Sequence, residues 1–393
     1  MSKLSPEDAS SYLSKAFFGW INPIFVRGNE DALKESDLLE LGASDDPTRV
    51  STEFESIYQR KLQTGGSPNA LTSSLMTQFW SPVWRAGVYK FGNSTMNLAP
   101  PILLNYLLKW LAGWYASGVS GGYPLWQGYV WCVALFLSLF VRTFIEAQYF
   151  HGMVRVGFQI RTALTTSVYR KALRLSPVAR QEVPTGQIVN LMQLDTNRVD
   201  MFMQQLHVLW DGAYQISTNM VLLGIYIGPS CLAGLATMLV LIPVNFWAMS
   251  RSAAIRRDIV KENDQRVKVM NEILQGIRAL KVYAWEAFFG AKVGKIRERE
   301  LRAVRAAAIQ TAITSTIMFT APVVVAVVTL MVYAGSGGDF NAATVFTALQ
   351  ILNTLRFPLM FYPMAIVGLA DAKVSLERLN KFMEKSEVPK ARG

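Results

Sequence analysis

The sequence has few of the residues from which metal centres and disulfide frameworks are built. Its 393 residues include two cysteines, Cys132 and Cys231, and two histidines, His151 and His207. Both cysteines lie in or beside long apolar runs, where two thiols provide neither a disulfide framework nor a cluster of metal ligands. The two histidines are isolated from each other and are interpreted as ordinary polar helix residues. No metal site is therefore predicted.

The motifs of phosphate binding and of zinc peptidases are missing as well. A phosphate loop needs G-x-x-x-x-G-K-[ST], and Phe289 stands where the first glycine would precede Gly294-Lys295, the only Gly-Lys pair. No H-E-x-x-H occurs, and no spacing suggests a nucleophile beside a base. The sequence therefore predicts no ATP site and no catalytic residue within the chain.

Long apolar runs are what the sequence does contain. Hydrophobic residues make up 51% of the chain, and six runs are about 20 residues or longer, enough for a helix to cross a bilayer core. Helices satisfy their own backbone polar groups in lipid, so the runs predict an all-α membrane protein rather than a large soluble helical core. The polar N-terminus, MSKLSPEDASSYL, lacks the apolar core of a signal peptide, and insertion is expected to use the first span. The predicted spans are 88–112, 126–150, 206–227, 230–249, 308–334 and 341–369.

The distribution of the net charge of +11 predicts the topology. Segments 151–205 and 251–305 carry seven and fourteen Lys or Arg residues, whereas 113–125, the turn at Gly228-Pro229 and 335–340 carry none. Basic residues accumulate on the cytoplasmic side, so both termini and both long loops are predicted to be cytoplasmic. A nucleic-acid-binding function would require a recognition motif, and none is seen.

The two long loops keep a helical spacing of apolar residues and contain two predicted bends. The spacing indicates that the spans continue as helical stalks far beyond the membrane surface. The first bend falls at LSPVARQEVPTG, where Pro177, Pro184 and Gly186 break the pattern. The second falls in GIRALKVYAWEAFFG, an aromatic stretch inside a basic segment. Long stalks with bent tips suit a protein that transmits motion from the cytoplasm to a membrane cavity.

Ionisable residues inside the spans are candidates for contact with a substrate or with a neighbouring helix. Arg142 and Glu146 are spaced i, i+4 and are interpreted as a structural pair. Lys90 and Arg356 are the other candidates, and a guanidinium can bind a carboxylate, sulfonate or phosphate through two hydrogen bonds. The alternative for Arg356 is a polar contact to a neighbouring helix. Beside it, Phe357, Phe361 and Tyr362 could form an apolar wall, while Pro358 and Pro363 would distort the helix.

Several of these segments together resemble the multidrug-resistance-associated (C-type) subfamily of ABC exporters. YRKALRLSPVARQEVPTGQIVNLMQLDTNRVDMF and GIRALKVYAWEAFFGAKVGKIRERE resemble its first and second intracellular loops. GPSCLAGLATMLVLIPVN, LRFPLMFYPM and VSLERLNKFM resemble its fourth span, sixth span and exit helix, and FFGWINP with RGNEDALKESDLLEL resembles its N-terminal lasso. The resemblance implies a six-helix, type IV transmembrane domain with coupling helices, and the following domains: a cytoplasmic lasso and linker at 1–68, an interfacial elbow helix at 69–83, the transmembrane domain at 84–375, and an exit helix and linker at 376–393.

The resemblance also implies a role for the bends. In the family, each loop docks a short coupling helix into a nucleotide-binding domain, so Pro184 and Gly186 would mark the first coupling region. Tyr283, Trp285 and Phe288 would form an aromatic knob at the second, oriented by Glu286. The alternative is that these aromatic side chains pack on their own stalk helices.

The implied function is the membrane part of an ATP-driven exporter of amphipathic organic anions, such as glutathione-type conjugates. Arg356, Phe357, Lys90 and Phe361 are the candidate substrate contacts. ATP and Mg²⁺ would bind a nucleotide-binding domain that this chain does not contain, and a second six-helix domain would complete the transporter in a plasma, vacuolar or lysosomal membrane. A truncated product or separate ATPase chains would each explain the ending at 393. The alternative functions are a channel, a channel regulator or a fragment that transports nothing.

Overall fold

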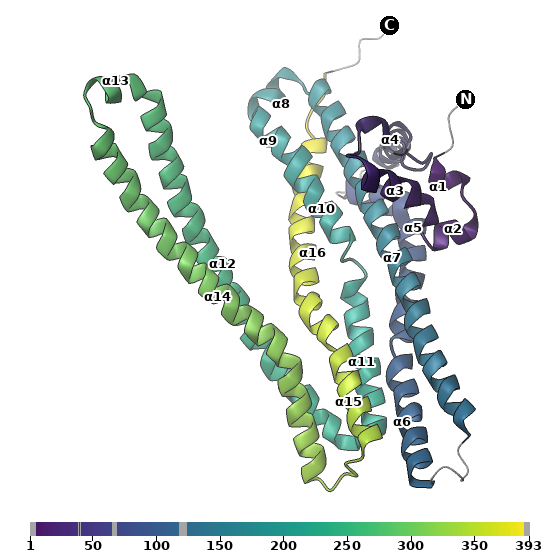
Figure 1. The fold of residues 1–393 in the computed structure, drawn as a ribbon. Coiled ribbons are helices and arrows are strands. Elements are labelled where there is room, and N and C mark those ends of the chain that lie inside the picture. The colour runs from purple at the N-terminus through teal and green to yellow at the C-terminus, as the bar shows by residue number, and fades with distance from the viewer. Residues whose placement is uncertain (1–4, 38, 40, 65–68, 118–123, 389–393) are drawn as a thin grey trace. The chain divides into compact units, whose positions relative to one another are not determined.

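The computed structural model describes residues 5–388, apart from 38, 40, 65–68 and 118–123. The chain divides into two compact units, Met1–Thr218 with Phe357–Gly393, and Asn219–Arg356. Figure 1 shows helices throughout, and the described residues include no β-strand, only an isolated bridge between Leu175 and Glu387. The all-α membrane fold predicted from the sequence is confirmed.

The helices of the first unit fall into a leader and a membrane-and-stalk group. The leader consists of α1 (Pro6–Ala9), α2 (Tyr12–Ala16), η1 (Gly19–Ile21), α3 (Asn22–Glu30), η2 (Glu35–Asp37) and α4 (Pro47–Gln63). The second group consists of α5 (Ala70–Met96), α6 (Ala99–Ser117), α7 (Leu125–Arg174), α8 (Pro177–Glu182), α9 (Thr185–Asn190), the π-helical η3 (Leu191–Asp195), α10 (Thr196–Met203), most of α11 (Val208–Ile227) and α16 (Arg356–Met383).

Four helical segments of the described chain are long and apolar enough to cross a membrane: Leu125–Arg174, Thr185–Gln275, Glu286–Gly335 and Ala342–Met383. The second of these contains two predicted spans, because α11 and α12 (Cys231–Gln275) meet at the single turn η4 (Gly228–Ser230). The structure divides the predicted first span, 88–112, between α5 and α6 at Asn97 and Leu98. Pro100 and Pro101 have no backbone N–H to donate to the preceding turn, which explains a new helix at Ala99.

The last predicted span is also interrupted. α15 (Ala342–Thr354) ends just before Leu355, and α16 begins at Arg356. Pro358 cannot donate a hydrogen bond to the carbonyl four residues earlier, so the proline that was expected to distort this helix lies directly after the break.

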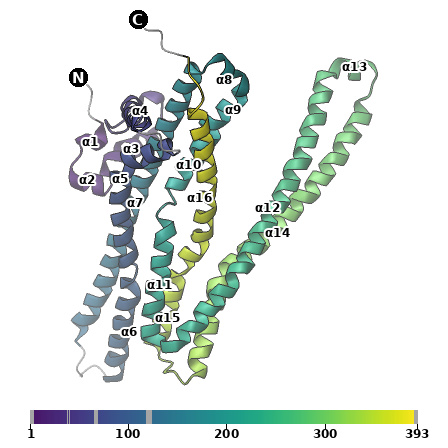
Figure 2. The ribbon, with the colours of Figure 1, turned by 180° about the vertical axis from the view of Figure 1, so that it is seen from behind.

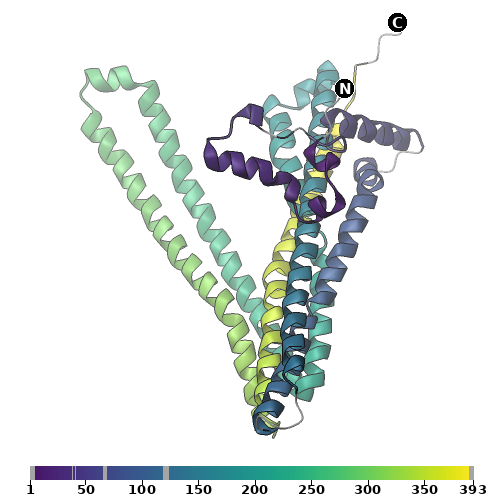
Figure 3. The same ribbon diagram turned by 45° about the vertical axis from the view of Figure 1, so that its right-hand side comes forward.

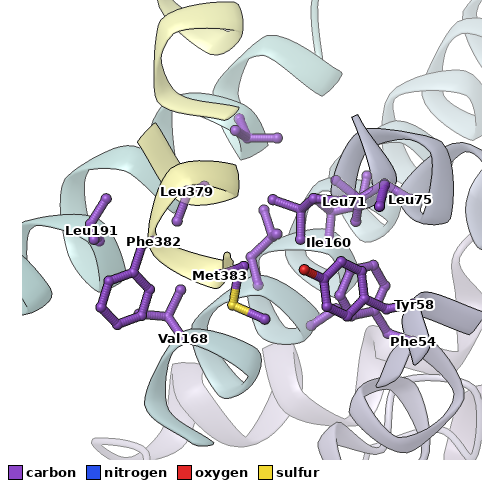
Figure 4. Close-up of a cluster of buried hydrophobic side chains, with 14 of the residues drawn as sticks. Phe54, Tyr58, Leu71, Leu75, Ile160, Val168, Leu191, Leu379, Phe382 and Met383 are labelled. Carbon is purple, nitrogen blue, oxygen red and sulfur yellow. The ribbon is translucent and has the colours of Figure 1, made fainter. Parts of the chain in front are cut away.

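One apolar core joins the leader to α5, α7, η3 and α16 of the first unit. Figure 4 shows Phe54 and Tyr58 of α4 beside Leu71 and Leu75 of α5 and Ile160 of α7. The same core continues to Val168 of α7, Leu191 of η3, and Leu379, Phe382 and Met383 of α16. α7 packs against α4, α5, α6 and α10 and is the central helix of this unit.

The leader is also attached to α7 by a partly buried polar contact. The Arg155 guanidinium donates to Glu7 at 2.8 Å and pairs with Asp45 at 2.6 Å. Hydrogen bonding to Asp45 raises the pKa of Arg155, against the opposing effect of burial. This contact was not predicted from the sequence, because Glu7 and Asp45 lie 148 and 110 residues before Arg155 along the chain.

The second unit is a long pair of helices. α12 and α14 (Glu286–Gly335) pack side by side, and the short α13 (Ile277–Val282) joins them at one end, as Figures 1 to 3 show from three directions. With 50 residues at about 1.5 Å each, α14 is roughly 75 Å long, far more than a bilayer core of about 30 Å. The predicted stalks are therefore present.

Close packing and polar contacts hold the two stalk helices together. A Cβ placed on Gly234 would lie 2.6 Å from Thr329 Oγ1, so glycine permits the close approach near the end of the pair opposite α13. Further along, the Gln310 side-chain amide donates to the Ala248 carbonyl at 3.3 Å. Near the tip, the buried Glu300 accepts from Arg266 at 2.8 Å. Packing and polar contacts between α12 and α14 therefore recur along the length of the pair.

Candidate functional site

The tip of the second unit is a compact turn around α13. The Trp285 backbone N–H donates to the Leu280 carbonyl at 3.0 Å, and Leu280 is buried beneath the turn. Ala284 has φ of 52°, in the left-handed region that is costly for a residue with a Cβ. This conformation reverses the chain between Val282 and Glu286 and projects Tyr283 and Trp285 outward.

The aromatic side chains of this tip contact one another and remain exposed. Tyr283 and Trp285 stack with ring centroids 5.1 Å apart, and Trp285 lies 6.5 Å from Phe289. Phe288 meets Phe289 edge-to-face at 5.4 Å. The exposed fractions of Tyr283, Trp285 and Phe288 are 64%, 53% and 68%. Aromatic surface of this kind, clustered on a rigid turn, has the composition of an interface hot spot. We call these four residues the aromatic tip.

Charges surround the aromatic tip. Lys281 pairs with Glu286 at 3.0 Å across the turn. The pKa of the Glu286 carboxyl is lowered, first by a hydrogen bond from its own backbone N–H and then by Lys281. The Lys292 ammonium lies 5.7 Å from the centre of the Phe289 ring. Glu286 is therefore a negative charge held by Lys281, and Lys281 and Lys292 are positive charges beside the aromatic tip.

Below the tip, Glu300 connects the two stalk helices. It lies 2.8 Å from Arg266 of α12 and 2.9 Å from Arg297 of its own helix. The pKa of Glu300 is lowered chiefly by the hydrogen bond from Arg297 and also by Arg266. This cross-link keeps the stalk stiff next to the tip.

The first unit has a tip of its own, formed by α8 and α9. Ser176 caps α8 by accepting from the Ala179 N–H at 3.2 Å, and Pro184 precedes α9. Pro184 and Gly186 are exposed, and nothing lies within 4 Å of a Cβ built on Gly186. Both residues predicted for the first coupling region therefore lie on its outer surface.

Contacts that tie the segments flanking this tip to the C-terminal part of the chain were not predicted from the sequence. Asp195, fully buried in η3, accepts from Ser375 at 3.0 Å and from Arg378 at 3.1 Å. Lys171 also pairs with Glu387 at 2.9 Å. An Asp at the end of a helical loop gives no signal of such a contact, because its partners lie 180 and 183 residues further along the chain.

A buried polar cluster lies within the membrane part of the first unit. The Lys90 ammonium of α5 is 3.1 Å from Asp211 of α11, and both side chains are almost fully buried. Asp211 also accepts from the Ser94 hydroxyl and, at 2.7 Å, from Gln215. Asp211 was not predicted, although an acidic residue in an apolar run is the signal that could have identified it.

Three of the four predicted substrate contacts belong to the first unit and lie together. Lys90 Nζ is 5.7 Å from the centre of the Phe357 ring, and the Phe357 and Phe361 rings are 4.4 Å apart. The fourth, Arg356, belongs to the second unit, where its guanidinium carbon lies 4.7 Å from the centre of the Phe319 ring. The expected pair of Arg142 with Glu146 is formed, at 3.9 Å.

Comparison with known proteins agrees with this architecture. The family model of the ABC transporter transmembrane region matches residues 83–359. The chain belongs to this family. As an ABC transmembrane region it carries no phosphate loop, and its bent tips occupy the positions at which the C-type resemblance predicts coupling helices.

Members of the C subfamily are among the relatives of this ABC transmembrane region. It is 32% identical to ABC transporter C family member 8 of Dictyostelium discoideum over 98% of the chain and 24% of that relative. It is 33% identical to human ATP-binding cassette sub-family C member 2 over 84% of the chain and 21% of that relative. For mouse sub-family C member 4 the identity is 28%, over 98% of the chain and 29% of the relative. The resemblance to the C subfamily is confirmed, and the chain spans about a quarter of the length of these relatives.

Proposed function

We propose that this domain is the membrane-spanning and motion-transmitting part of an ATP-driven exporter of amphipathic organic anions. The observation that carries the proposal is the aromatic tip: exposed aromatic side chains on a rigid turn at the end of a stiff two-helix stalk. Burying such rings in a partner would remove apolar surface from water, with a gain of about 25 cal/mol for each Å². The partner that fits is a nucleotide-binding domain that binds ATP and Mg²⁺.

The exposed tip of the first unit has a related role in the proposal. Pro184 and Gly186 contact the nucleotide-binding domain from α8 and α9, and Asp195 passes displacement of this tip to α16 through Ser375 and Arg378. The stalks then convert closure of the nucleotide-binding domains into rearrangement of the spans, with both termini and both tips in the cytoplasm.

The anionic substrate class rests on Arg356. This guanidinium forms no ion pair with any carboxylate in the described part of the chain, and it lies over the face of the Phe319 ring. Lys90, in contrast, is neutralised by Asp211 at 3.1 Å. In this proposal Arg356 therefore supplies the charge for a carboxylate, sulfonate or phosphate.

Site-directed photo-crosslinking tests the role of the tip. A benzophenone amino acid would replace Phe288 in the complete transporter in membranes, and the matched control would replace Phe340, which is 57% exposed but lies far from the tip in sequence. We expect a covalent product between position 288 and a nucleotide-binding domain, and none from position 340. Equal labelling from both positions, or labelling of lipid alone at 288, would contradict the proposal.

A further inference from the structure

The first unit contains an apolar cavity that the proposed transport function does not use. Its volume is about 410 Å³, within the range of roughly 300–1,000 Å³ typical of small-molecule sites. Four helices contribute to the walls, among them Phe79 of α5, Ile160 of α7, Phe202 of α10, and Leu376 of α16, and Leu75 of α5 also lines the cavity. Leu75 also belongs to the apolar core in Figure 4, so one wall of the cavity is held in place by that core.

Exposed tryptophans mark the α5 side of this cavity. Trp80 lines the cavity and is 56% exposed, and it stacks on Trp84, which is 62% exposed, at 6.3 Å. Tryptophan concentrates at the boundary between lipid tails and headgroups, because its ring is apolar and its N–H is polar. The first charged residue of α5 is Arg85, so residues 70–84 contribute no charged side chain of their own, and the Lys61 ammonium of α4 donates to Thr77 on this segment at 2.6 Å. The cavity is thus placed where the acyl chain of a lipid could enter.

Two opposite charges on α16 lie at the polar part of the lining. Lys373 and Glu377 are one helical turn apart, both line the cavity, and both are exposed. Residues at this spacing can pair, yet neither forms an ion pair with any residue in the described part of the chain. A ligand with one negative and one positive group would satisfy both, whereas a purely anionic ligand would place negative charge beside Glu377.

We propose that this cavity binds an acyl chain of a zwitterionic phospholipid, with the phosphate near Lys373 and the ammonium headgroup near Glu377. The lining does not include Arg356, and the proposal does not depend on the exporter function. A bound chain would fill the space between α5, α10 and α16, and would stabilise the cytoplasmic part of the first unit.

The test uses the full chain purified in maltoside micelles and a phosphatidylcholine that carries a diazirine on one acyl chain. Photolysis followed by peptide mass spectrometry identifies the labelled residues. We expect labelling on α5, α10 and α16 that is competed by unlabelled phosphatidylcholine about tenfold better than by phosphatidylglycerol or palmitate. If phosphatidylglycerol or palmitate competes equally well, the zwitterionic assignment is wrong.

Two sets of variants separate the cavity from general lipid contact. Leu376→Trp fills the cavity and should abolish labelling of its lining, whereas Val374→Trp places the same ring on an exposed position outside the lining and should leave labelling unchanged. Lys373→Gln with Glu377→Gln changes exposed side chains only, and should reduce the preference for phosphatidylcholine over phosphatidylglycerol about fivefold. Labelling that persists in Leu376→Trp, or a preference unchanged in the double variant, would overturn the proposal.

Discussion

Removal of the negative charge of Asp211 should destabilise the first unit strongly. Lys90 and Asp211 are 3.1 Å apart, with side chains 4% and 2% exposed. At an effective dielectric constant of about 20, two unit charges at that distance attract by roughly 5 kcal/mol. Asp211→Asn retains an oxygen that can accept from Ser94 and Gln215, so the substitution removes mainly the charge. Because Lys90 is then buried without a counter-charge, we expect the free energy of unfolding to fall by about 3–5 kcal/mol.

An exposed ion pair provides the matched control. Lys385 and Glu182 are closer, at 2.5 Å, but their side chains are 38% and 55% exposed. Water and salt screen such a pair, so Glu182→Gln should cost no more than about 1 kcal/mol despite the shorter distance. The contrast separates burial from proximity as the cause of the effect.

Equilibrium unfolding in mixed micelles with increasing dodecyl sulfate measures both values, with fluorescence from the ten tryptophans as the signal. A double-mutant cycle with Lys90→Met and Asp211→Leu should show that the double variant recovers most of the stability lost in Asp211→Asn. The reasoning is refuted if Asp211→Asn and Glu182→Gln lower the free energy of unfolding by the same amount. It is also refuted if the double variant loses more stability than the two single variants lose when their losses are added together.

Three further predictions concern the anion contact, the packing of α7 and the response to pH. Arg356→Ala in the complete transporter should reduce ATP-dependent uptake of carboxyfluorescein into inside-out vesicles more than uptake of a neutral dye, and equal losses would argue against charge recognition. Gly157→Ala should destabilise the first unit by about 1–3 kcal/mol, because the new methyl group meets Asp200, including its carbonyl oxygen at 3.2 Å. Gly152→Ala on the same helix has nothing within 4 Å and should be neutral or stabilising by up to about 1 kcal/mol, as dodecyl sulfate unfolding would measure. The pKa of Glu300 lies below its ordinary value of 4.5 because Arg297 and Arg266 stabilise the carboxylate. The folded protein therefore binds this proton less readily than the unfolded chain, and the contribution to stability is present above pH 4.5 and lost as the pH falls through the lowered pKa. Glu300→Gln should lack this acid-dependent loss, which melting temperatures measured from about pH 6 to about pH 3 would reveal.

The features of the fold that were predicted from the sequence are those that depend on local pattern. Apolar runs and proline positions indicated most of the spans, the bend before α8 and a distortion in the last span, because hydrophobicity and a missing N–H act within a few residues. The aromatic tip was visible for the same reason, since Tyr283, Trp285 and Phe288 lie within six positions. The division of the first span at Asn97 was not expected, although Pro100 and Pro101 could have indicated it.

The features that were missed depend on contacts between distant residues. Asp211 neutralises Lys90 from 121 positions away, and Asp195 binds Arg378 across 183 positions. The charges of Asp211 and Asp195 are evident from the sequence, but their partners depend on how the helices pack. The assignment of Lys90 and Arg356 to substrate contact stays a prediction, and their different environments could not be read from their spacing in the chain.

The central claim is that the aromatic tip transmits motion, and the coupling ratio of Trp285→Ala tests it most directly. ATP hydrolysis and ATP-dependent uptake of carboxyfluorescein would be measured on the same vesicles carrying the complete transporter, with Tyr169→Ala, an exposed aromatic residue of α7, as the control. Truncation of one central hot-spot residue to alanine typically lowers the binding free energy of an interface by about 2 kcal/mol or more. We therefore predict that Trp285→Ala reduces the transport obtained per ATP hydrolysed by about tenfold or more while binding of the dye is retained, and that Tyr169→Ala does not. Normal transport per ATP in Trp285→Ala would contradict the account.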